Sequence, residues 1–562
     1  MTHLPLPPAS TIALILLAFT LTCALAYLRG TLHRHPRPGV TPATPHAGFA
    51  SPDQLRTHLS EAAVRHAGTQ VRPSLTDDSS PTSYGYFLGN ATHPACDRTP
   101  LYSPYDQALR VIGPMGSGKT FRFLARLLRD VPGPTLATST KPDLIELTLS
   151  ARRRRGPVVT LDPQELVPGQ EPLRWSPIHG AEDTLTAELR GRAFIAGSRA
   201  TASGSGRTDE GAAHYRHLAG TWLSCLIHAA ALDGASWREV LRWAKRPEDP
   251  APRQILHHHP GAGPGWAESL LDATTGDDRA VGNTRSTLAN ALAAFAHQPV
   301  IDAVDVPPDQ ATDIEALLDA NGTLYLLGKD SAHSTISPLV TAITEDVLDR
   351  AEHLAVTKPH RRLDPPLVVA LDEAPNIAPL PSLRQRVADG RGRGLCVIYL
   401  VQGWASAESR FGRDVAKELA AITNNTLVLG GSHDVALLKD LQELCGTTEI
   451  LKTSATINRA PRRTRPTGSS RSVSHDREPV LRAHDIQHLD IATGQALLLA
   501  GNLPPILVEL PPLTAHPDWP QISADIATIR THADDTRTHH QEQRRLTHQR
   551  HHTTWQTGRP TP

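Results

Sequence analysis

Short apolar runs recur along this chain, each bounded by glycine, proline or polar residues. Runs of this kind are typical of strands that are buried on both faces of a parallel sheet. They predict strands at residues 84–88, 107–112, 135–138, 157–161, 322–327, 366–371, 394–401, 425–429, 494–500 and 505–510. Segments with helical spacing between them predict helices at residues 121–129, 144–155, 337–354, 413–422 and 434–445. This alternation predicts an α/β fold built around a parallel sheet.

The pattern changes between residues 183 and 305, where apolar positions follow helical spacing. Helices are predicted at residues 187–196, 214–232, 237–243 and 284–296, with a Gly/Ser-rich loop at 203–211. We therefore expect an all-helical insertion at 183–305 that divides the α/β region into a first part, 101–182, and a second part, 306–512.

The N-terminal region predicts a membrane anchor. Residues 11–28 carry no charged side chain, and their number is close to the minimum for a helix that spans a bilayer. Arg29, Arg34 and Arg37 follow this segment, whereas only His3 precedes it. By the positive-inside rule, residues 1–10 lie outside and the bulk of the chain lies in the cytoplasm, anchored in the inner (plasma) membrane by a single pass. A cleaved signal peptide is the alternative, but the segment lacks a positively charged start.

The regions that flank the α/β part are polar. Residues 29–100 are predicted to form a juxtamembrane linker and the segment that leads into the α/β region, with Ser51 capping a helix at 51–67. Residues 513–562 are rich in histidine and arginine and predict a largely disordered tail.

Composition narrows the function classes only slightly. The chain has 562 residues, too many for one ordinary domain, and its formal net charge is zero, so overall charge does not indicate a nucleic-acid partner. The five cysteines are scattered without a C-x-x-C pair, which argues against a zinc pattern and a disulfide framework. The histidine pairs at 539–540 and 551–552 lack the cysteine or carboxylate partners of a metal site.

Residues 452–482 form a basic stretch rich in Pro, Ser and Thr. Its arginines are Arg459, Arg462, Arg463, Arg465, Arg471 and Arg477. Clustered arginines give salt-dependent affinity for nucleic-acid phosphates whatever the base sequence, but a disordered, solvated loop has the same composition. Both interpretations stay open. Few aromatic residues are interleaved, so base stacking is not indicated.

The most specific motif is Gly113-Pro114-Met115-Gly116-Ser117-Gly118-Lys119-Thr120, which follows a predicted strand and matches the G-x-x-x-x-G-K-T phosphate loop. Backbone N–H groups of such a loop, together with a helix N-terminus, surround phosphate oxygens. Lys119 would contact the β- and γ-phosphates, and the Thr120 hydroxyl would hold Mg²⁺. We therefore predict that this loop binds ATP and Mg²⁺ in a RecA-like motor domain.

A second motif follows the predicted strand at 366–371. Asp372 and Glu373 come at its carboxyl end, and in α/β sheets these ends face the ligand crevice. Asp372 is predicted to hold the Mg²⁺ shell and Glu373 to polarise the attacking water, because hydrolysis needs in-line water attack and charge neutralisation on the γ-phosphate.

The next predicted strand, 394–401, supplies a third candidate. Gln402 ends it and is predicted to sense the γ-phosphate. Arg391 and Arg393 come just before this strand, and an arginine from a neighbouring subunit is a common stabiliser of phosphoryl charge. We predict Arg391 as such a finger, which implies a ring of subunits. The choice between Arg391 and Arg393 stays open, as does the alternative that both are solvated loop charges.

In this order, the motifs resemble those of the TraG/TraD-type coupling proteins of type IV secretion and conjugation. The likeness covers residues 47–512 and is weakest in the helical insertion. It is carried by the phosphate loop and by residues 48–51, 139–144, 174–178, 371–377, 390–394, Gln402, 411–412, 494–498 and 504–505.

The resemblance implies a membrane-anchored homo-hexamer that hydrolyses ATP. Its partners would be DNA, single-stranded with a relaxase, or a secreted protein, together with the proteins of a secretion channel. The helical insertion would be the family's all-alpha domain. The sequence departs from the family pattern, because it has one predicted transmembrane helix where two are usual and has Ser139 and Pro142 in the 139–144 motif. These departures indicate a divergent, actinobacterial-like member.

Two other functions share these motifs. An FtsK-like translocase of duplex DNA would use the same phosphate loop and strand chemistry, but the helical insertion and the 390–402 block favour the coupling protein. An adaptor that binds ATP without hydrolysing it is the other alternative. The presence of Glu373 argues against the adaptor.

Overall fold

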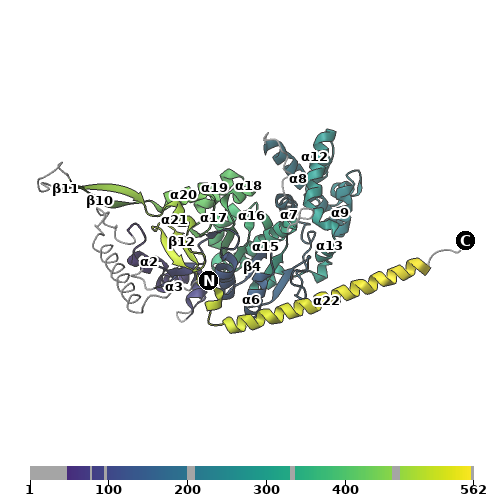
Figure 1. The fold of residues 1–562 in the computed structure, drawn as a ribbon. Helices are drawn as coiled ribbons and strands as arrows, with labels where there is room; N and C mark the ends of the chain where they lie inside the picture. The colour runs from purple at the N-terminus through teal and green to yellow at the C-terminus, as the bar shows by residue number, and fades with distance from the viewer. Residues whose placement is uncertain are drawn as a thin grey trace, which may run out of the picture. The chain divides into compact units, whose positions relative to one another are not determined.

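The structure is a computed structural model that describes residues 47–75, 79–93, 98–198, 209–329, 336–457 and 469–557 (Figure 1). It contains two compact units, one made of Met1–Phe49 and Glu443–Leu481 and the other of Ala50–Gln442 and Arg482–Pro562. The predicted membrane segment, 11–28, lies outside the described residues. Among the helices that are described, none combines the length and apolar character needed to span a bilayer.

The larger unit is built on one mixed sheet, in which the described residues form eleven strands. Their spatial order is β2 (Pro100–Pro104), β1 (Gly85–Ala91), β13 (Ile506–Glu509), β12 (Gln495–Ala500), β9 (Asn425–Leu429), β3 (Leu109–Ile112), β8 (Leu395–Val401), β7 (Leu367–Leu371), β4 (Thr135–Ser139), β6 (Thr323–Leu327) and β5 (Val158–Leu161). Neighbours from β9 to β5 run parallel, and β12, β13, β1 and β2 extend the sheet antiparallel. The predicted α/β fold with a large parallel sheet is therefore confirmed.

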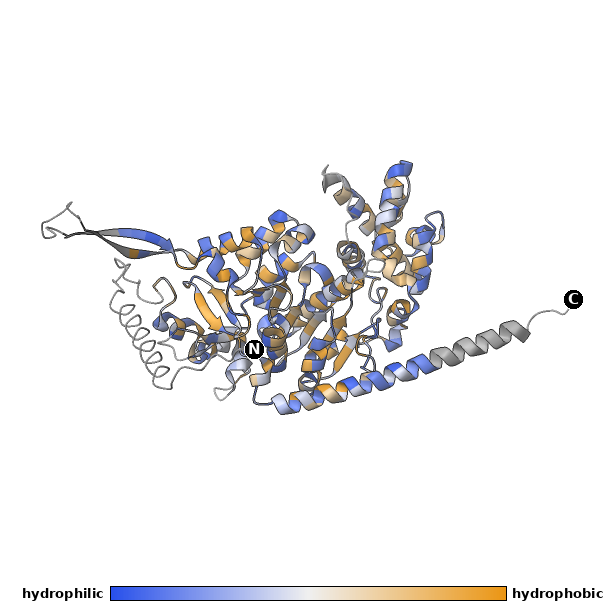
Figure 2. Ribbon diagram, viewed as in Figure 1, coloured by the Kyte–Doolittle hydropathy of each residue, from blue (hydrophilic) through white to orange (hydrophobic). Residues whose placement is uncertain are grey.

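The central strands are apolar because helices cover both faces of the parallel part. Every residue of β7 and β8 is buried, which explains why their sequences read as continuous apolar runs. Figure 2 shows hydrophobic strands in orange among helices that carry both hydrophobic and hydrophilic residues. The connecting helical segments are η2 (Lys119–Leu124), α5 (Ala125–Asp130), α6 (Asp143–Arg153), α15 (Ser337–Thr357), η5 (Pro359–Arg361), α16 (Ala374–Ile377), α17 (Leu383–Arg393), α18 (Trp404–Phe411), α19 (Arg413–Ile422), α20 (Val435–Cys445), α21 (Ala483–Gln487) and η6 (Leu513–Ala515).

The single helix expected at 51–67 is two helices, α2 (Pro52–Leu59) and α3 (Glu61–Val71), followed by the short α4 (Pro81–Tyr84). Ser51 caps α2 as predicted, through a side chain that accepts from the Gln54 backbone N–H. Ser60 interrupts the helical pattern because its hydroxyl accepts from the Ala63 N–H and starts a second helix.

Between β5 and β6, every regular element of the described residues is helical. These elements are α7 (Thr184–Gly197), α8 (Asp209–Asp233), α9 (Trp237–Lys245), α10 (Ala251–His258), α11 (Trp266–Thr274), α12 (Asp278–Ala291), η3 (Ala293–Ala296), α13 (Gln298–Val304), η4 (Pro308–Gln310) and α14 (Ile314–Asp319). A buried ion pair fastens α7 to α15, in which Arg190 Nη2 lies 2.8 Å from Asp346 Oδ1.

The smaller unit contains a β-hairpin that overlaps the basic stretch, for which the sequence predicted no strand. Strand β10 (Thr447–Ile457) pairs antiparallel with β11 (Ser469–Pro479) along its whole length. The Thr, Ser, Ile and Val residues of the two strands favour a β conformation. The proline and arginine residues of the basic stretch favour a loop, which is why the sequence did not predict these strands. Arg459, Arg462, Arg463 and Arg465 lie outside the described residues.

The C-terminal tail also differs from the expectation of disorder, because α22 covers Trp519–Thr557. Ile522, Ile529 and Ala533 are buried and lie on one side of this helix. Arg530 Nη2 lies 2.7 Å from Glu146 Oε2 of α6. The few apolar positions at helical spacing are therefore enough to dock a segment whose composition is strongly polar.

Candidate active site

The phosphate loop connects β3 to the helical segment η2, and η2 continues into α5. Gly116 has φ +82° and Gly118 has φ +91°, which L-residues with side chains rarely adopt. The backbone N–H of Gly113 donates to Val401 O of the neighbouring strand β8 at 3.2 Å. A Cβ atom at Gly113 would lie 2.6 Å from Ser117 Oγ, so the loop closes tightly on itself. The glycines predicted from the motif are thus required by the backbone.

Lys119 is 8% exposed, although it carries a charge. Its Nζ donates to the carbonyl oxygens of Gly113 and Pro114. Burial lowers the pKa of Lys119, and the nearby carboxylates of Asp372 and Glu373 oppose that shift. The Ser117 hydroxyl is buried in the same loop and has no hydrogen-bond partner. A phosphate group in the loop would neutralise the Lys119 charge and give the Ser117 hydroxyl a hydrogen-bond partner. The residues therefore fit a nucleotide.

Asp372 follows β7 and is 7% exposed. Burial, and after it the neighbouring Glu373 carboxylate, raise its pKa to about 6, although the Lys119 and Lys141 ammonium groups oppose this shift. Asp372 and Lys119 therefore interact electrostatically across β8, the strand that separates β7 from β3. Buried carboxylate oxygen is a ligand that Mg²⁺ favours, and the fit to this ion is good.

Glu373 and Gln402 meet at the same edge of the sheet. Gln402 Nε2 donates to Glu373 Oε1 at 2.5 Å, and the two residues follow adjacent strands, β7 and β8. Glu373 has φ +53°, an uncommon conformation for a residue other than glycine, and α16 begins directly after it. Strained backbone of this kind clusters at functional sites.

Lys141 is a site residue that the sequence analysis did not single out. It follows β4, the neighbour of β7, and its charge lowers the pKa of both Asp372 and Lys119. The Ser139 hydroxyl accepts from the Lys141 N–H at 3.2 Å and donates to the Lys141 carbonyl at 3.0 Å. The available signal was its place just after a buried strand, at the edge where Asp372 lies.

Arg391 does not join this group within the chain. It lies at the end of α17, just before β8 begins, and its Nε is 2.8 Å from Asp106 Oδ2. Gln402 follows the other end of β8, so the seven residues of this strand, about 23 Å in length, separate the two. Arg391 and Arg393 are helical residues and not the loop charges we considered. A finger role for Arg391 requires a neighbouring subunit and stays a prediction.

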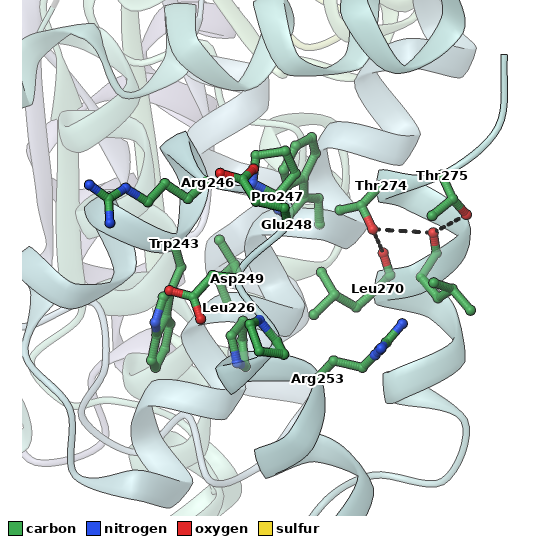
Figure 3. Close-up of a pocket in the computed structure, with 14 residues that line it drawn as sticks. Leu226, Trp243, Arg246, Pro247, Glu248, Asp249, Arg253, Leu270, Thr274 and Thr275 are labelled. Atoms are coloured by element: carbon green, nitrogen blue, oxygen red, sulfur yellow. Dashed lines mark hydrogen bonds between the residues drawn. The ribbon is translucent and has the colours of Figure 1, made fainter. Parts of the chain in front are cut away.

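A separate cavity of about 370 Å³ lies in the helical region, residues 183–305, among residues of α8, α9, α10 and α11 (Figure 3). Its lining includes Trp222, Trp243 and Leu270, with Arg246 and Arg253 among the charged residues. The Thr274 hydroxyl beside it donates to the Leu270 carbonyl at 2.7 Å. None of the predicted site residues lines this cavity, so it is distinct from the phosphate loop.

Residues 366–490 match the family model described as the TraM recognition site of TraD and TraG. This range includes Asp372, Glu373 and Gln402. The resemblance to the TraG/TraD-type coupling proteins is confirmed. No curated protein sequence matches the chain.

Solved coupling-protein structures share the fold. The unbound monoclinic form of the bacterial conjugative coupling protein TrwBdeltaN70 is 18% identical, with a TM-score of 0.55 over 79% of this chain and 91% of that chain. The plasmid coupling protein TrwB with the non-hydrolysable ATP analogue ADPNP is 20% identical, with a TM-score of 0.52 over 72% and 85%. TrwB with ADP and Mg²⁺ is 18% identical, with a TM-score of 0.53 over 76% and 95%. The TM-scores show a shared fold at these low identities.

Proposed function

We propose that this protein is a membrane-anchored, ATP-driven motor that delivers DNA, or a DNA–protein complex, to a type IV secretion or conjugation channel. The observation that carries the proposal is the meeting of Lys119, Asp372, Glu373 and Gln402 at one edge of the sheet, although they come from distant parts of the sequence. The match to the TraM recognition site family and the fold of coupling proteins support the kind of motor.

The side chains can divide the work of ATP hydrolysis among them. The backbone of residues 113–118 and the Lys119 ammonium hold phosphate oxygens, and Thr120 and Asp372 hold Mg²⁺. The metal ion neutralises charge on the phosphates when it is bound. Glu373 polarises the attacking water, and Gln402 fixes the orientation of its carboxylate through the hydrogen bond between them.

Movement of a substrate needs an assembly, and the proposal includes a homo-hexamer. In such a ring, Arg391 of one subunit would stabilise phosphoryl charge in the next. The Arg391 guanidinium is exposed and lies at the opposite edge of the sheet from the phosphate loop of its own subunit. It could therefore act on a nucleotide of the next subunit but not on its own. The helical region at 183–305 would contribute to substrate choice, and the apolar segment at 11–28 would anchor the ring in the inner membrane.

The test is ATP turnover by the purified full chain, with and without DNA. We expect Mg²⁺-dependent turnover that rises when single-stranded DNA is added. Binding of nucleotide without turnover under any condition would contradict the motor and favour the adaptor. Stimulation by duplex DNA alone would favour an FtsK-like translocase. Lys119→Ala serves as the background control for contaminating ATPases.

A further inference from the structure

Helix α18 lies between the candidate active site and the helical region. It begins at Trp404, directly after the turn that carries Gln402, and it ends at Phe411. Near its end, Arg410 Nε donates to Pro375 O at 2.8 Å, and Arg410 Nη2 donates to Gly197 O at 3.4 Å. The Arg410 guanidinium thus joins two segments that are far apart in the sequence.

The first of these carbonyls belongs to the turn that holds Glu373. Pro375 is the second residue of α16, and this short helix starts immediately after Glu373. The backbone N–H groups of Asn376 and Ile377 both donate to Glu373 O, at 2.8 and 3.1 Å. Because α16 has only one turn, a contact to Pro375 O restrains the strained backbone of Glu373 as well.

The second carbonyl belongs to the last residue of α7. A Cβ atom at Gly197 would lie 2.4 Å from Pro338 Cα, so the end of α7 packs directly on the start of α15. Arg190, about two turns before Gly197 in α7, forms an ion pair with Asp346 of α15. The position of the Gly197 carbonyl therefore follows the position of α7, which is the first helix of the helical region.

The other end of α18 is fixed to the strand that feeds the phosphate loop. The Arg110 guanidinium of β3 lies 4.6 Å from the centre of the Trp404 ring. Arg110 Nη2 also donates to Thr426 Oγ1 of β9 at 3.1 Å. Cation–π contacts of this kind stabilise when they are desolvated, and both side chains are buried. Helix α18 thus has a fixed end at the sheet and a bridging end at Arg410.

We propose that Arg410 is a positioning residue that couples the placement of Glu373 to the position of α7. The inference rests on the proposed ATPase function, and it deepens that function by naming the contact that links hydrolysis to the helical region. When α7 shifts, the Gly197 carbonyl and Pro375 carbonyl cannot both keep their bonds to one guanidinium. The Glu373 carboxylate then loses its fixed place relative to the attacking water.

The test compares Arg410→Gln and Arg410→Lys with wild-type full-length protein. Arg384→Gln is the matched control, because Arg384 is a helical arginine that pairs with Glu418 at 2.8 Å and contacts neither carbonyl. Steady-state ATP turnover is measured first. We expect kcat to fall about 10- to 100-fold in Arg410→Gln with the KM for ATP unchanged, since small displacements of a catalytic group have effects of this size. Arg410→Lys keeps the charge but cannot span both carbonyls. Its kcat should therefore lie between the kcat of wild-type protein and that of Arg410→Gln.

Hydrogen exchange gives a second measurement that does not need turnover. In wild-type protein and in Arg384→Gln, addition of a non-hydrolysable ATP analogue with Mg²⁺ should change exchange in residues 184–197. In both Arg410 variants this change should be lost while exchange at residues 113–120 still responds. Wild-type kcat in the Arg410 variants, or a persistent response at 184–197, overturns the inference. If wild-type protein binds the analogue but lacks turnover, the proposed ATPase fails, and the exchange measurement still decides whether Arg410 couples the two regions.

Discussion

The Gln402 amide donates a 2.5 Å hydrogen bond to the Glu373 carboxylate, across the ends of two adjacent strands. This bond uses one carboxylate oxygen of Glu373 and restrains its side chain at the carboxyl ends of β7 and β8. The sensing role of Gln402, predicted from its place after a core strand, stays a prediction, and the bond adds a positioning role to the proposal. Gln402 and Glu373 act as a pair in the proposed reaction.

Replacement of Glu373 by Gln should separate nucleotide binding from hydrolysis. The amide preserves the shape but cannot accept a proton from water, so we expect turnover to fall about 100-fold or more while ATP stays bound. Retention of radiolabelled ATP after rapid gel filtration measures the trapped nucleotide. Normal hydrolysis by this variant would place the base elsewhere, and Glu418→Gln provides an exposed control on α19.

Lys119→Ala should abolish ATP turnover and leave the fold intact. The substitution removes the ammonium that the loop carbonyls and the nearby carboxylates surround, and it also removes a buried charge. Circular dichroism checks the fold and a fluorescent ATP analogue checks binding. The exposed Lys417→Ala is the control for loss of a positive charge. Turnover at the wild-type rate in Lys119→Ala would remove the phosphate loop from the mechanism.

Asp372→Asn should stabilise the nucleotide-free protein near neutral pH. The folded pKa of Asp372, about 6, is above the value of about 3.9 for an unfolded aspartate, so the folded state binds the proton more tightly. The free energy of unfolding therefore falls as pH rises from about 4 to about 6, by at most about 3 kcal/mol, and stays lower above that window. Asn carries no such charge. The difference in free energy of unfolding between Asp372→Asn and wild-type protein should therefore vanish below about pH 4.

Thermal melting across this pH range measures the difference. Addition of Mg²⁺ and an ATP analogue should raise the melting temperature of wild-type protein but not of Asp372→Asn, because the variant lacks the carboxylate ligand. Equal melting of both proteins at neutral pH, without nucleotide, would show that the Asp372 carboxylate is not destabilised by burial.

Lys141→Ala tests the residue that only the structure brought to the site. Its charge acts on both Asp372 and Lys119, so removal should raise the pKa of Asp372 further and shift the acid limb of the pH–rate profile upward. We also expect kcat at neutral pH to fall about 10-fold or more, as loss of one electrostatic contact does in other sites. Lys439→Ala, an exposed lysine on α20, is the control. An unchanged pH profile would exclude Lys141 from the site.

The basic stretch gives a prediction that depends on sequence alone. If Arg462 and Arg463 contact nucleic-acid phosphates, reversal of both to Glu should weaken DNA affinity and reduce its salt dependence. Fluorescence anisotropy with a labelled single strand at several salt concentrations measures both quantities. Unchanged affinity would mean that these arginines do not contact DNA. Arg174→Glu, far away along the chain and paired with Gln310, is a control that makes half of this change in net charge.

The sequence by itself determined most strands of the larger sheet, without β2 and without the β10–β11 hairpin, and it determined the chemistry of the phosphate loop. Apolar runs of the length of β7, β8 and β9 are typical of strands buried on both faces of a sheet, and the loop glycines are needed because two of them have positive φ. The carboxyl-end rule also placed Asp372, Glu373 and Gln402 at one edge, since parallel strands align their ends.

Tertiary structure alone decided the order of the strands, the role of Lys141 and the docking of α22. Local patterns do not encode which strand lies beside which, so the insertion of β8 between β3 and β7 could not be read from the chain. The same holds for Arg391, whose ion pair with Asp106 depends on the opposite end of β8. These features arise from contacts between residues far apart in sequence, and such contacts exist only after the sheet has formed.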